Sequence, residues 1–168
     1  MCLIKSRAKP SHHYWKIASP PSHTTEYPMK KNWLVTGGAG FIGSNFIRAS
    51  LGTRCHHIVN YDKLTYAACP ATVDELNALP SYELVQADLE DRSSFYNCLK
   101  KYRVDTVVNF AAESHVDRSI ETPDAFVRTN VLGTQAMLDA CLAYWCELPA
   151  EEAKSFRVLH VSTDEVYG

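Results

Sequence analysis

The stretch NWLVTGGAGFIGSNFI, residues 32–47, combines a short apolar run with four glycines: Gly37, Gly38, Gly40 and Gly43. The apolar run at residues 33–35 predicts a buried strand, and residues 41–51 predict a helix that begins at the glycine turn. Glycines spaced as G-x-x-G-x-x-G allow a tight turn and let the backbone approach a pyrophosphate closely. Free amides and the positive dipole at the start of the helix favour bound phosphates. The spacing therefore indicates a dinucleotide-binding turn, with a plain strand-to-helix turn as the alternative.

An acidic residue further along the chain favours the dinucleotide interpretation. Residues 57–61 predict a second strand, and Asp62 ends it, 19 residues after Gly43. A carboxylate at this place accepts hydrogen bonds from the adenosine ribose and repels a 2′-phosphate, so we expect NAD as the cofactor, not NADP. The nucleoside triphosphate P-loop is excluded because its pattern needs a lysine after the glycines, and none follows here.

Strand-like and helix-like segments alternate along the rest of the chain. Three further strands are predicted at residues 82–87, 105–110 and 156–161. Two further helices are predicted at residues 93–102 and 122–147. The long second helix is expected to begin with Thr122 as its N-cap. Alternating strands and helices predict an α/β fold, in which a doubly wound parallel sheet carries helices on both faces.

The composition is that of an ordinary globular chain. Of the 168 residues, 46% are hydrophobic and 21% are charged, which suits one domain. The net charge of −2 gives no general attraction to nucleic acid or anionic membranes. No apolar run approaches the roughly 18 residues of a membrane span. The six cysteines form no C-x-x-C pair and no zinc-ligand spacing, so we expect reduced, buried thiols, no metal site and a cytoplasmic protein.

The first 28 residues differ from the rest. They hold four basic residues, one acid, four prolines and three histidines, without helical or strand periodicity. We expect residues 1–28 to be a disordered leader or a mis-assigned start, with Met29 as the natural first residue and a transit peptide as a further alternative. Residues 29–168 then form the dinucleotide-binding domain.

Six motifs occur in order along residues 29–168: TGGAGFIG, YDKLTYA, ADLED, AAESHVDRSI, TNVLGT and STDEVYG. With them the chain resembles the N-terminal part of the extended short-chain dehydrogenase/reductase family and, more narrowly, the dTDP-glucose 4,6-dehydratase family. The glycine motif is shared by the whole superfamily, whereas DKLTYA, AAESHVDRSI and STDEVYG are more specific. Related epimerases usually carry a Ser-rich stretch in place of the last motif. The resemblance implies a Rossmann-type sheet, bound NAD and a dTDP-glucose-like nucleotide sugar as substrate.

The resemblance also implies which residues contact the cofactor. Asp62 and the residues after it match the segment that holds the adenosine ribose, Asp88 and Leu89 flank the adenine, and Ser114 lies near the sugar as well. The full cofactor set that it implies is Gly37, Gly40, Phe41, Ile42, Gly43, Asp62, Lys63, Leu64, Thr65, Asp88, Leu89, Phe110, Ala111, Ala112, Glu113, Ser114 and Thr129.

For the chemistry, the resemblance implies an internal oxidation, elimination and reduction. Hydride passes from sugar C4 to NAD⁺, the resulting ketone acidifies the C5 proton, water leaves, and the hydride returns to C6. Thr163 matches the residue that hydrogen-bonds the 4-hydroxyl, Glu165 the base and Asp164 the acid. One carboxyl must be protonated while its neighbour is ionised, which requires environments that separate their pKa values. A solvated acidic turn is the plain alternative for this pair.

The sequence also departs from the family pattern. The family completes its site with a Y-x-x-x-K pair beyond STDEVYG and with a C-terminal sugar-nucleotide domain, and neither follows Gly168. Tyr96 and Lys100 match the spacing, but on a helix expected to face away from the nicotinamide. We therefore expect the sheet to stop after its fifth strand and hydride transfer by this chain alone to be crippled, with little or no activity.

Other interpretations stay open at the level of sequence. The chain could belong to another sugar-nucleotide dehydratase or epimerase of the same superfamily, or it could be a non-catalytic NAD-binding module. The resemblance suggests a homodimer formed through the long helices. Asn130, in the middle of the long helix, either orients water or backbone near the site or serves helix packing. His115 is expected to be structural, not catalytic.

Overall fold

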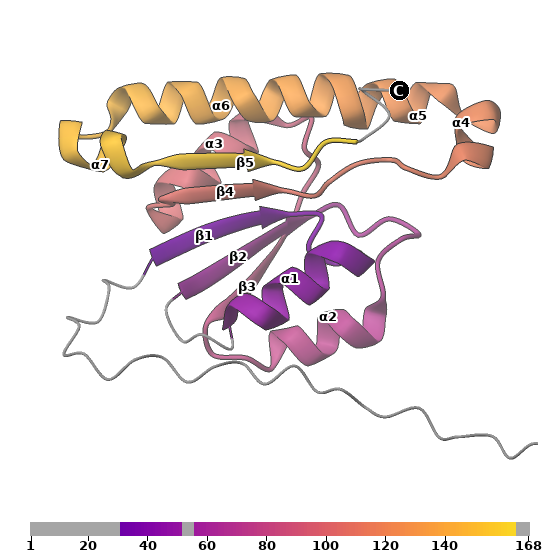
Figure 1. The fold of residues 1–168 in the computed structure, drawn as a ribbon, viewed down its shortest axis with the longest axis horizontal. Coiled ribbons are helices and arrows are strands. Elements are labelled where there is room, and N and C mark those ends of the chain that lie inside the picture. Colours follow the sequence, from indigo (N-terminus) through magenta and orange to yellow (C-terminus); the bar gives the residue numbers. More distant parts are fainter. Residues whose placement is uncertain (1–30, 52–55, 164–168) are drawn as a thin grey trace, which may run out of the picture.

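The computed structural model describes residues 31–51 and 56–163. Its five strands are all parallel and form one sheet in the order β3-β2-β1-β4-β5 (Figure 1). In chain order the elements are β1 (Lys31–Thr36), α1 (Phe41–Leu51), β2 (His56–Asp62), α2 (Pro70–Asn77), β3 (Tyr82–Gln86), α3 (Arg92–Tyr102), β4 (Thr106–Asn109), α4 (Val116–Glu121), α5 (Pro123–Phe126), the π-helix η1 (Val127–Gly133), α6 (Thr134–Glu147), α7 (Ala150–Ser155) and β5 (Arg157–His160).

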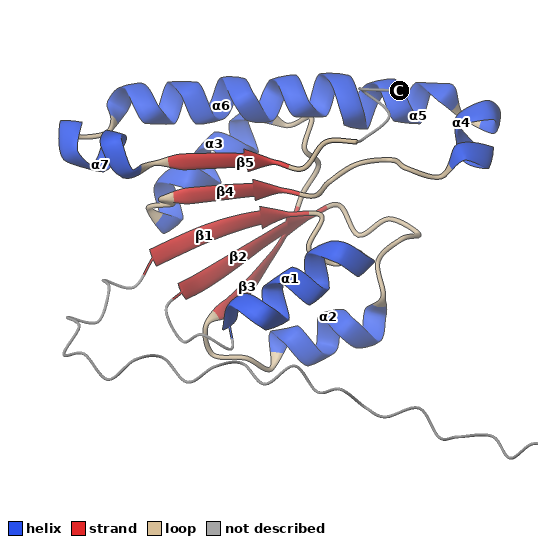
Figure 2. Ribbon diagram, in the orientation of Figure 1, coloured by secondary structure: helices blue, strands red, loops and turns tan. Residues whose placement is uncertain are grey.

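Both faces of the sheet are apolar because successive residues of each central strand point to opposite sides. On one face, side chains such as Leu34 and Val107 pack with residues of α3 and α6. On the other face, Val35 and Val108 pack with residues of α1 and α2. Figure 2 shows helices on either side of the strands. The doubly wound parallel sheet predicted from the sequence is therefore confirmed.

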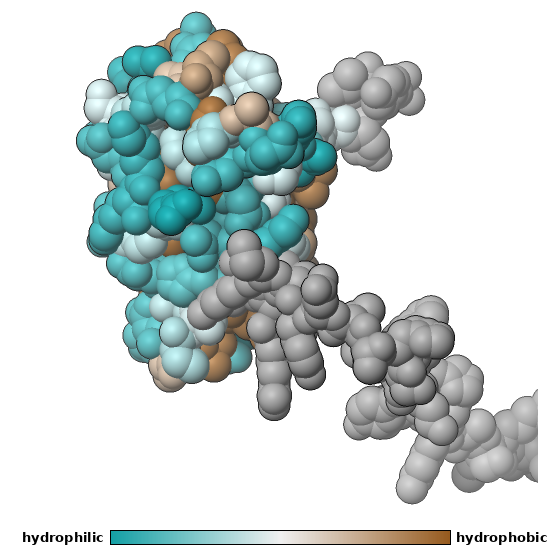
Figure 3. All heavy atoms as spheres, turned by 90° about the vertical axis from the view of Figure 1, so that its left-hand side faces the viewer, coloured by the Kyte–Doolittle hydropathy of each residue, from teal (hydrophilic) through white to brown (hydrophobic). Residues whose placement is uncertain are grey.

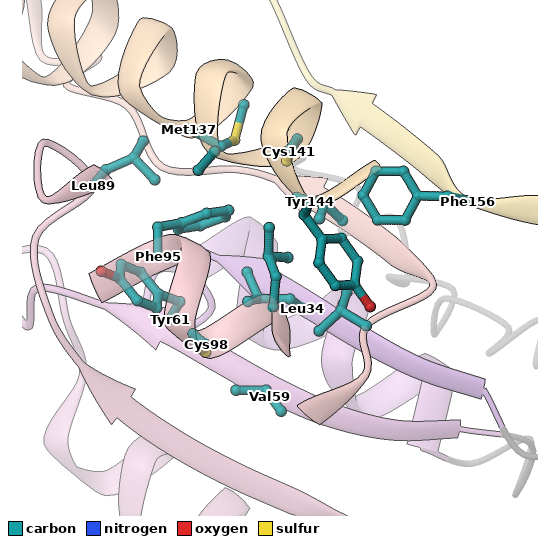
Figure 4. Close-up of a cluster of buried hydrophobic side chains, with 14 residues drawn as sticks. Leu34, Val59, Tyr61, Leu89, Phe95, Cys98, Met137, Cys141, Tyr144 and Phe156 are labelled. Carbon is teal, nitrogen blue, oxygen red and sulfur yellow. The ribbon is translucent and has the colours of Figure 1, made fainter. Parts of the chain in front are cut away.

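The larger core cluster is held together by aromatic side chains under α3 and α6 (Figure 4). Tyr61 and Phe95 meet edge to face with ring centroids 5.0 Å apart, and Tyr144 meets Phe156 in the same way at 5.5 Å. Phe95 is completely buried. Burying one such side chain stabilises a fold by about 1.5–3 kcal/mol, so this cluster ties β5, α3 and α6 to the central strands.

All five strands end at the same edge of the sheet, since they are parallel and adjacent (Figure 1). Ligands of open α/β sheets bind beyond these carboxyl ends, where the loops to the helices begin. The opposite end of the molecule, which carries α7 and the amino ends of the strands, is mostly hydrophilic, with hydrophobic side chains gathered toward one margin (Figure 3). A ligand site is therefore expected at the carboxyl ends of β1, β2 and β4.

Every strand predicted from the sequence is present, and the helices predicted at residues 41–51 and 93–102 are confirmed to within one residue. Three short helices were not predicted: α2, α4 and α7. Pro70 occupies the first turn of α2 and Pro149 is the N-cap of α7, so both prolines begin a helix here.

The long helix predicted at residues 122–147 is not one regular helix. It consists of α5, the π-helical segment η1 and α6. Thr122 is the N-cap residue of α5, as predicted, but its side chain caps no amide there: the Thr122 hydroxyl donates a hydrogen bond back to the carbonyl of Arg118 in α4. Apolar periodicity cannot distinguish a π segment from an α-helix, and such segments occur frequently at functional sites.

The cysteine prediction is confirmed in part. Cys98 and Cys141 are buried free thiols, and burial raises the pKa of each to about 12, which keeps them protonated. Cys69 and Cys146 are also free but exposed, so the expectation of burial is wrong for these two. Among the described residues, no helix is both long and apolar enough to cross a membrane. The interpretation of residues 1–28 falls outside the described residues.

Candidate functional site

The glycine turn between β1 and α1 has a backbone that only glycine fits at two positions. Gly37 has a φ of +66°, and a side chain there would bring its Cβ to 2.7 Å from the backbone nitrogen of Ala111. A Cβ on Gly43 would lie 2.3 Å from the carbonyl oxygen of Gly37. The Gly37 amide donates to the carbonyl of Tyr61 at 3.2 Å, which fastens the turn to β2. These contacts explain the first and last glycines of the motif.

Gly40 has a different role, since a Cβ there would meet only the Gly37 carbonyl oxygen, at 3.3 Å. It lines a cavity at the carboxyl edge of the sheet. The amides of residues 41–43 follow in the first turn of α1, where an α-helix offers no internal acceptor. The turn thus leaves a small concave surface in front of unpaired N–H groups and a positive helix dipole, which is the arrangement that binds phosphate.

Asp62 lies at the end of β2 and is fixed by two backbone amides. Its carboxylate accepts hydrogen bonds from Ala39 at 2.9 Å and from Leu64 at 2.8 Å. Leu64, whose amide donates to Asp62, adopts a left-handed φ of 58°. Each carboxylate oxygen has a further lone pair, so Asp62 can also accept hydrogen bonds from a ligand hydroxyl. The carboxylate therefore joins the glycine turn to the loop that follows β2.

A cavity brings most of the predicted cofactor residues together. It is lined by Gly37, Gly40, Asp62, Lys63, Thr65, Asp88, Leu89, Phe110, Ala111, Ala112, Glu113 and Thr129, all named by sequence reasoning, and by Tyr61, Ala67 and Ala68, which it missed. Lys63 forms an ion pair with Asp88 across the cavity. Partial burial by itself raises the pKa of Asp88, but the hydrogen bonds from Lys63 and the Glu90 amide outweigh it and hold the pKa below its ordinary value.

A second cavity continues from the first, and the two share residues 110–113. Of the predicted residues, Ile42, Ser114 and Thr163 line this second cavity. Its remaining walls come from α4, α5, η1, α6 and the end of β5: Val116, Ser119, Phe126, Asn130, Thr134, His160, Val161 and Ser162. Phe41, Gly43 and Leu64 line neither cavity. Asp164 and Glu165, the predicted acid and base, lie outside the described residues.

The loops after β2 and β4 meet at the mouth of the first cavity. Tyr66 donates its hydroxyl to the carboxylate of Glu113 at 2.8 Å, and the guanidinium of Arg118 lies 3.7 Å from the centre of the Tyr66 ring. The hydrogen bond to Glu113 raises the pKa of Tyr66. The ring of His115 lies 6.0 Å from that of Tyr66. These residues anchor one loop to the other.

Asn130, in η1, holds the loop after β4 by its backbone. Its side-chain oxygen accepts from the Glu113 amide and its side-chain nitrogen donates to the Glu113 carbonyl, both at 2.9 Å. Of the two interpretations left open by the sequence, the structure supports orientation of backbone near the site. Residues 110–113 line both cavities, so Asn130 holds in place a wall that the two cavities share.

We predict that Asn130→Ala weakens dinucleotide binding more than it weakens the fold. Asn130 is exposed, so water can replace its bonds to Glu113, and the loss of stability should stay near 1 kcal/mol. The loop after β4 would lose its fixed position, and we expect affinity to fall about tenfold. Asn130→Asp, which can still accept from the Glu113 amide, should lie between wild type and alanine. Equal affinities for all three proteins would contradict this role.

The fold and the site together define a Rossmann-type dinucleotide-binding fold. The family model described as GDP-mannose 4,6 dehydratase matches residues 34–168, and the chain belongs to this family. Its relatives include dTDP-glucose 4,6-dehydratases from Xanthomonas campestris and Neisseria gonorrhoeae. They are 51% and 47% identical over 81% and 83% of this chain. The chain spans only 38% and 40% of the length of these two relatives.

Solved structures agree with this assignment. A dTDP-glucose 4,6-dehydratase from Streptomyces venezuelae, solved with NAD bound, superposes with a TM-score of 0.70 at 42% identity. That match covers 82% of this chain and 41% of the other. A UDP-glucose 4-epimerase from Brucella ovis in complex with NAD superposes with a TM-score of 0.66 at 32% identity, over 82% of this chain and 37% of the other.

Proposed function

We propose that this chain is the NAD-binding part of a dTDP-glucose 4,6-dehydratase, a lyase of nucleotide-sugar metabolism. One observation carries the proposal: the glycine turn, at Gly37 and Gly40, and Asp62 line one cavity at the start of α1. The relatives favour dehydration over epimerisation as the reaction, since the dehydratases have a higher sequence identity to the chain than the epimerase has. A reduced, cytoplasmic setting fits the free thiols at Cys98 and Cys141.

The residues around the first cavity have the hydrogen-bonding groups that a dinucleotide requires. We assign the pyrophosphate to Gly37, Gly40 and the amides of residues 41–43, and the adenosine ribose to Asp62, with Lys63, Leu64 and Thr65 beside it. Asp88 and Leu89 would flank the adenine. Residues 110–114 and Thr129 would contact the part of the cofactor that leads to the nicotinamide. The carboxylate of Asp62 disfavours a 2′-phosphate, which selects NAD over NADP.

The second cavity is the proposed place of the sugar, next to Ser114 and Thr163. Bound NAD supplies a hydride acceptor that later returns the hydride to the sugar. As hydride leaves C4, the 4-hydroxyl proton would pass to the tyrosine that the family supplies in its Y-x-x-x-K pair, while Thr163 would hold the 4-hydroxyl. Glu165 would then take the C5 proton, and Asp164 would protonate the departing C6 hydroxyl. Tyr96 and Lys100 have no part in this, because both bind Glu147 on the outer surface between α3 and α6.

The identity of the product tests the proposed reaction. The protein is incubated with NAD and dTDP-glucose, and the sugar nucleotides are separated and identified by mass and NMR. We expect a 4-keto-6-deoxy sugar, formed slowly and lost in Asp164→Asn and Glu165→Gln. A product that differs from the substrate only at C4 would favour an epimerase. Bound NAD with no product at all would contradict turnover by this chain alone, and it fits both the NAD-binding part of a dehydratase and a non-catalytic NAD-binding module.

We further propose that the protein forms a homodimer through η1 and α6. This helix has an apolar stripe apart from its core face: Val127, Val131, Leu138, Leu142 and Trp145, each between 46% and 58% exposed. Its core face is formed by Met137, Ala140, Cys141 and Tyr144. A continuous apolar stripe on a long helix is a common subunit contact.

Leu142→Glu tests the dimer. A charge in the centre of the stripe should shift the sedimentation equilibrium to monomers, because an unpaired carboxylate is costly to bury. The circular dichroism spectrum should stay unchanged, since Leu142 is 58% exposed. Glu151→Gln on α7, outside the stripe, serves as a control for surface charge. A wild-type protein that sediments as a monomer at all concentrations would contradict the proposal.

A further inference from the structure

Three polar side chains lie side by side across the sheet, on the face covered by α3 and α6. Thr36 of β1 is in register with Asn109 of β4, and Asn109 is in register with His160 of β5. Thr36 and Asn109 are completely buried, whereas His160 is exposed at the end of its strand. Buried polar groups need hydrogen-bond partners, so the direction of each bond in this row can be worked out.

The direction of the hydrogen bonds is set at Thr36, the first residue of the row. The backbone amide of Ala111 can only donate, and it donates to the Thr36 hydroxyl oxygen at 3.3 Å. A hydroxyl can accept two hydrogen bonds, but the buried proton of Thr36 needs an acceptor of its own, and the hydrogen bond that Thr36 donates goes to the side-chain oxygen of Asn109. The Asn109 side chain is thereby oriented with its oxygen toward Thr36 and its NH₂ group toward His160.

The last bond of the row decides the tautomer of His160. The Asn109 amide nitrogen lies 2.8 Å from Nδ1 of His160. An NH₂ group is a donor only, so Nδ1 must be the acceptor and carries no proton. In a neutral imidazole the remaining proton is then on Nε2. The other tautomer would place two donors against each other and leave a buried amide unpaired.

His160 lines the second cavity together with Ser162 and Thr163. Nδ1 is occupied by Asn109, so Nε2–H is the ring group left for a ligand. We propose that His160 is a donor of fixed tautomer in the second cavity, where its Nε2–H binds a carbonyl or hydroxyl oxygen of the ligand. The tautomer follows from the row alone, whereas the identity of the ligand rests on the proposed function.

NMR of the histidine ring nitrogens tests the tautomer. Long-range ¹H–¹⁵N correlation spectra of the labelled protein distinguish the two neutral tautomers, and the His160 signals are assigned by their absence in His160→Gln. We expect the Nε2–H form in the wild type. In Asn109→Asp, a carboxylate accepts from both neighbours, so the ring proton should move to Nδ1. The signals of His115, which lies on another loop, should not change.

Two results would overturn the tautomer. One is a wild-type His160 with its proton on Nδ1, and the other is an unchanged tautomer in a folded Asn109→Asp. Thr36→Val provides a second variant should Asn109→Asp fail to fold. It removes the hydroxyl that orients Asn109, so His160 should become a mixture of tautomers. A pure Nε2–H form in Thr36→Val would also contradict the role of this row in setting the tautomer.

Ligand titrations test the donor role. We expect the Nε2 signal to shift on addition of NAD or of dTDP-glucose to the NAD-loaded protein, and the titration that moves it identifies which ligand supplies the oxygen. His160→Phe should weaken that ligand about fivefold, and His160→Gln, which keeps an N–H donor, should weaken it less. ADP, which occupies only the first cavity, should bind both variants as it binds wild type. A signal that neither ligand moves would rule out the donor role, while failure of ADP to bind would instead overturn the proposed function.

Discussion

Replacing Gly43 by alanine should destabilise the fold by about 3 kcal/mol and abolish dinucleotide binding. The new Cβ would lie 2.3 Å from the carbonyl oxygen of Gly37 and 2.8 Å from Cα of Gly38. Both are backbone atoms of the glycine turn, so no side-chain rotation can relieve the contact. Alanine favours a helix over glycine by only about 1 kcal/mol, which does not compensate for the contact. Urea unfolding followed by circular dichroism measures the loss.

Gly40→Ala is the matched control for this prediction. Its Cβ would meet a single atom at 3.3 Å, so the free energy of unfolding should change by less than about 1 kcal/mol. Gly40 lines the first cavity, however, and the added methyl group should weaken dinucleotide binding while the fold persists. Equal stability of the Gly43→Ala and Gly40→Ala variants would show that the turn relaxes more easily than its geometry indicates.

The second large effect concerns Asp62. In Asp62→Ala we expect the affinity for NAD to fall about a hundredfold, because the proposed ribose hydroxyls lose a charged acceptor worth about 3 kcal/mol. The same substitution removes the acceptor of the Ala39 and Leu64 amides, which loosens the glycine turn and the loop after β2. Affinity for NADP should fall much less, because the charge that repels a 2′-phosphate is removed as well. Calorimetric titration with both dinucleotides measures the change.

The Asp62→Asn variant distinguishes the effect of the negative charge on dinucleotide binding from the effect of the hydrogen bonds. Asparagine keeps one acceptor oxygen for the backbone amides and removes the negative charge. We expect its affinity for NAD to lie between those of wild type and Asp62→Ala, with the NAD-to-NADP ratio already reduced. Unchanged NAD affinity in Asp62→Ala would mean that the ribose lies elsewhere.

The main elements of the fold could be predicted from the sequence because each depends on a local pattern. The strands β1, β2 and β4 are short apolar runs. A run of consecutive apolar residues is enough to predict a strand that is buried on both faces of the sheet. The glycine turn and Asp62 were predicted because both are tied to one motif at a known separation. The helices α2 and α7 were missed, although Pro70 and Pro149 mark their starts, because a proline also ends a helix.

Residues that act through distant partners could not be predicted. The bond between Asn60 and the Gly38 amide joins positions 22 residues apart, and that between Tyr66 and Glu113 joins positions 47 apart. The row from Thr36 to His160 crosses three strands. A single sequence contains no signal for such pairings. They depend on strand order and register, which only the folded sheet defines.

We infer that the first cavity binds NAD through the glycine turn and Asp62. The most direct measurement is a calorimetric titration of the wild-type protein with NAD and, separately, with NADP. We predict saturable binding of NAD at one site per chain and binding of NADP that is at least tenfold weaker. Absence of NAD binding by the folded protein, or equal affinity for the two dinucleotides, would contradict it.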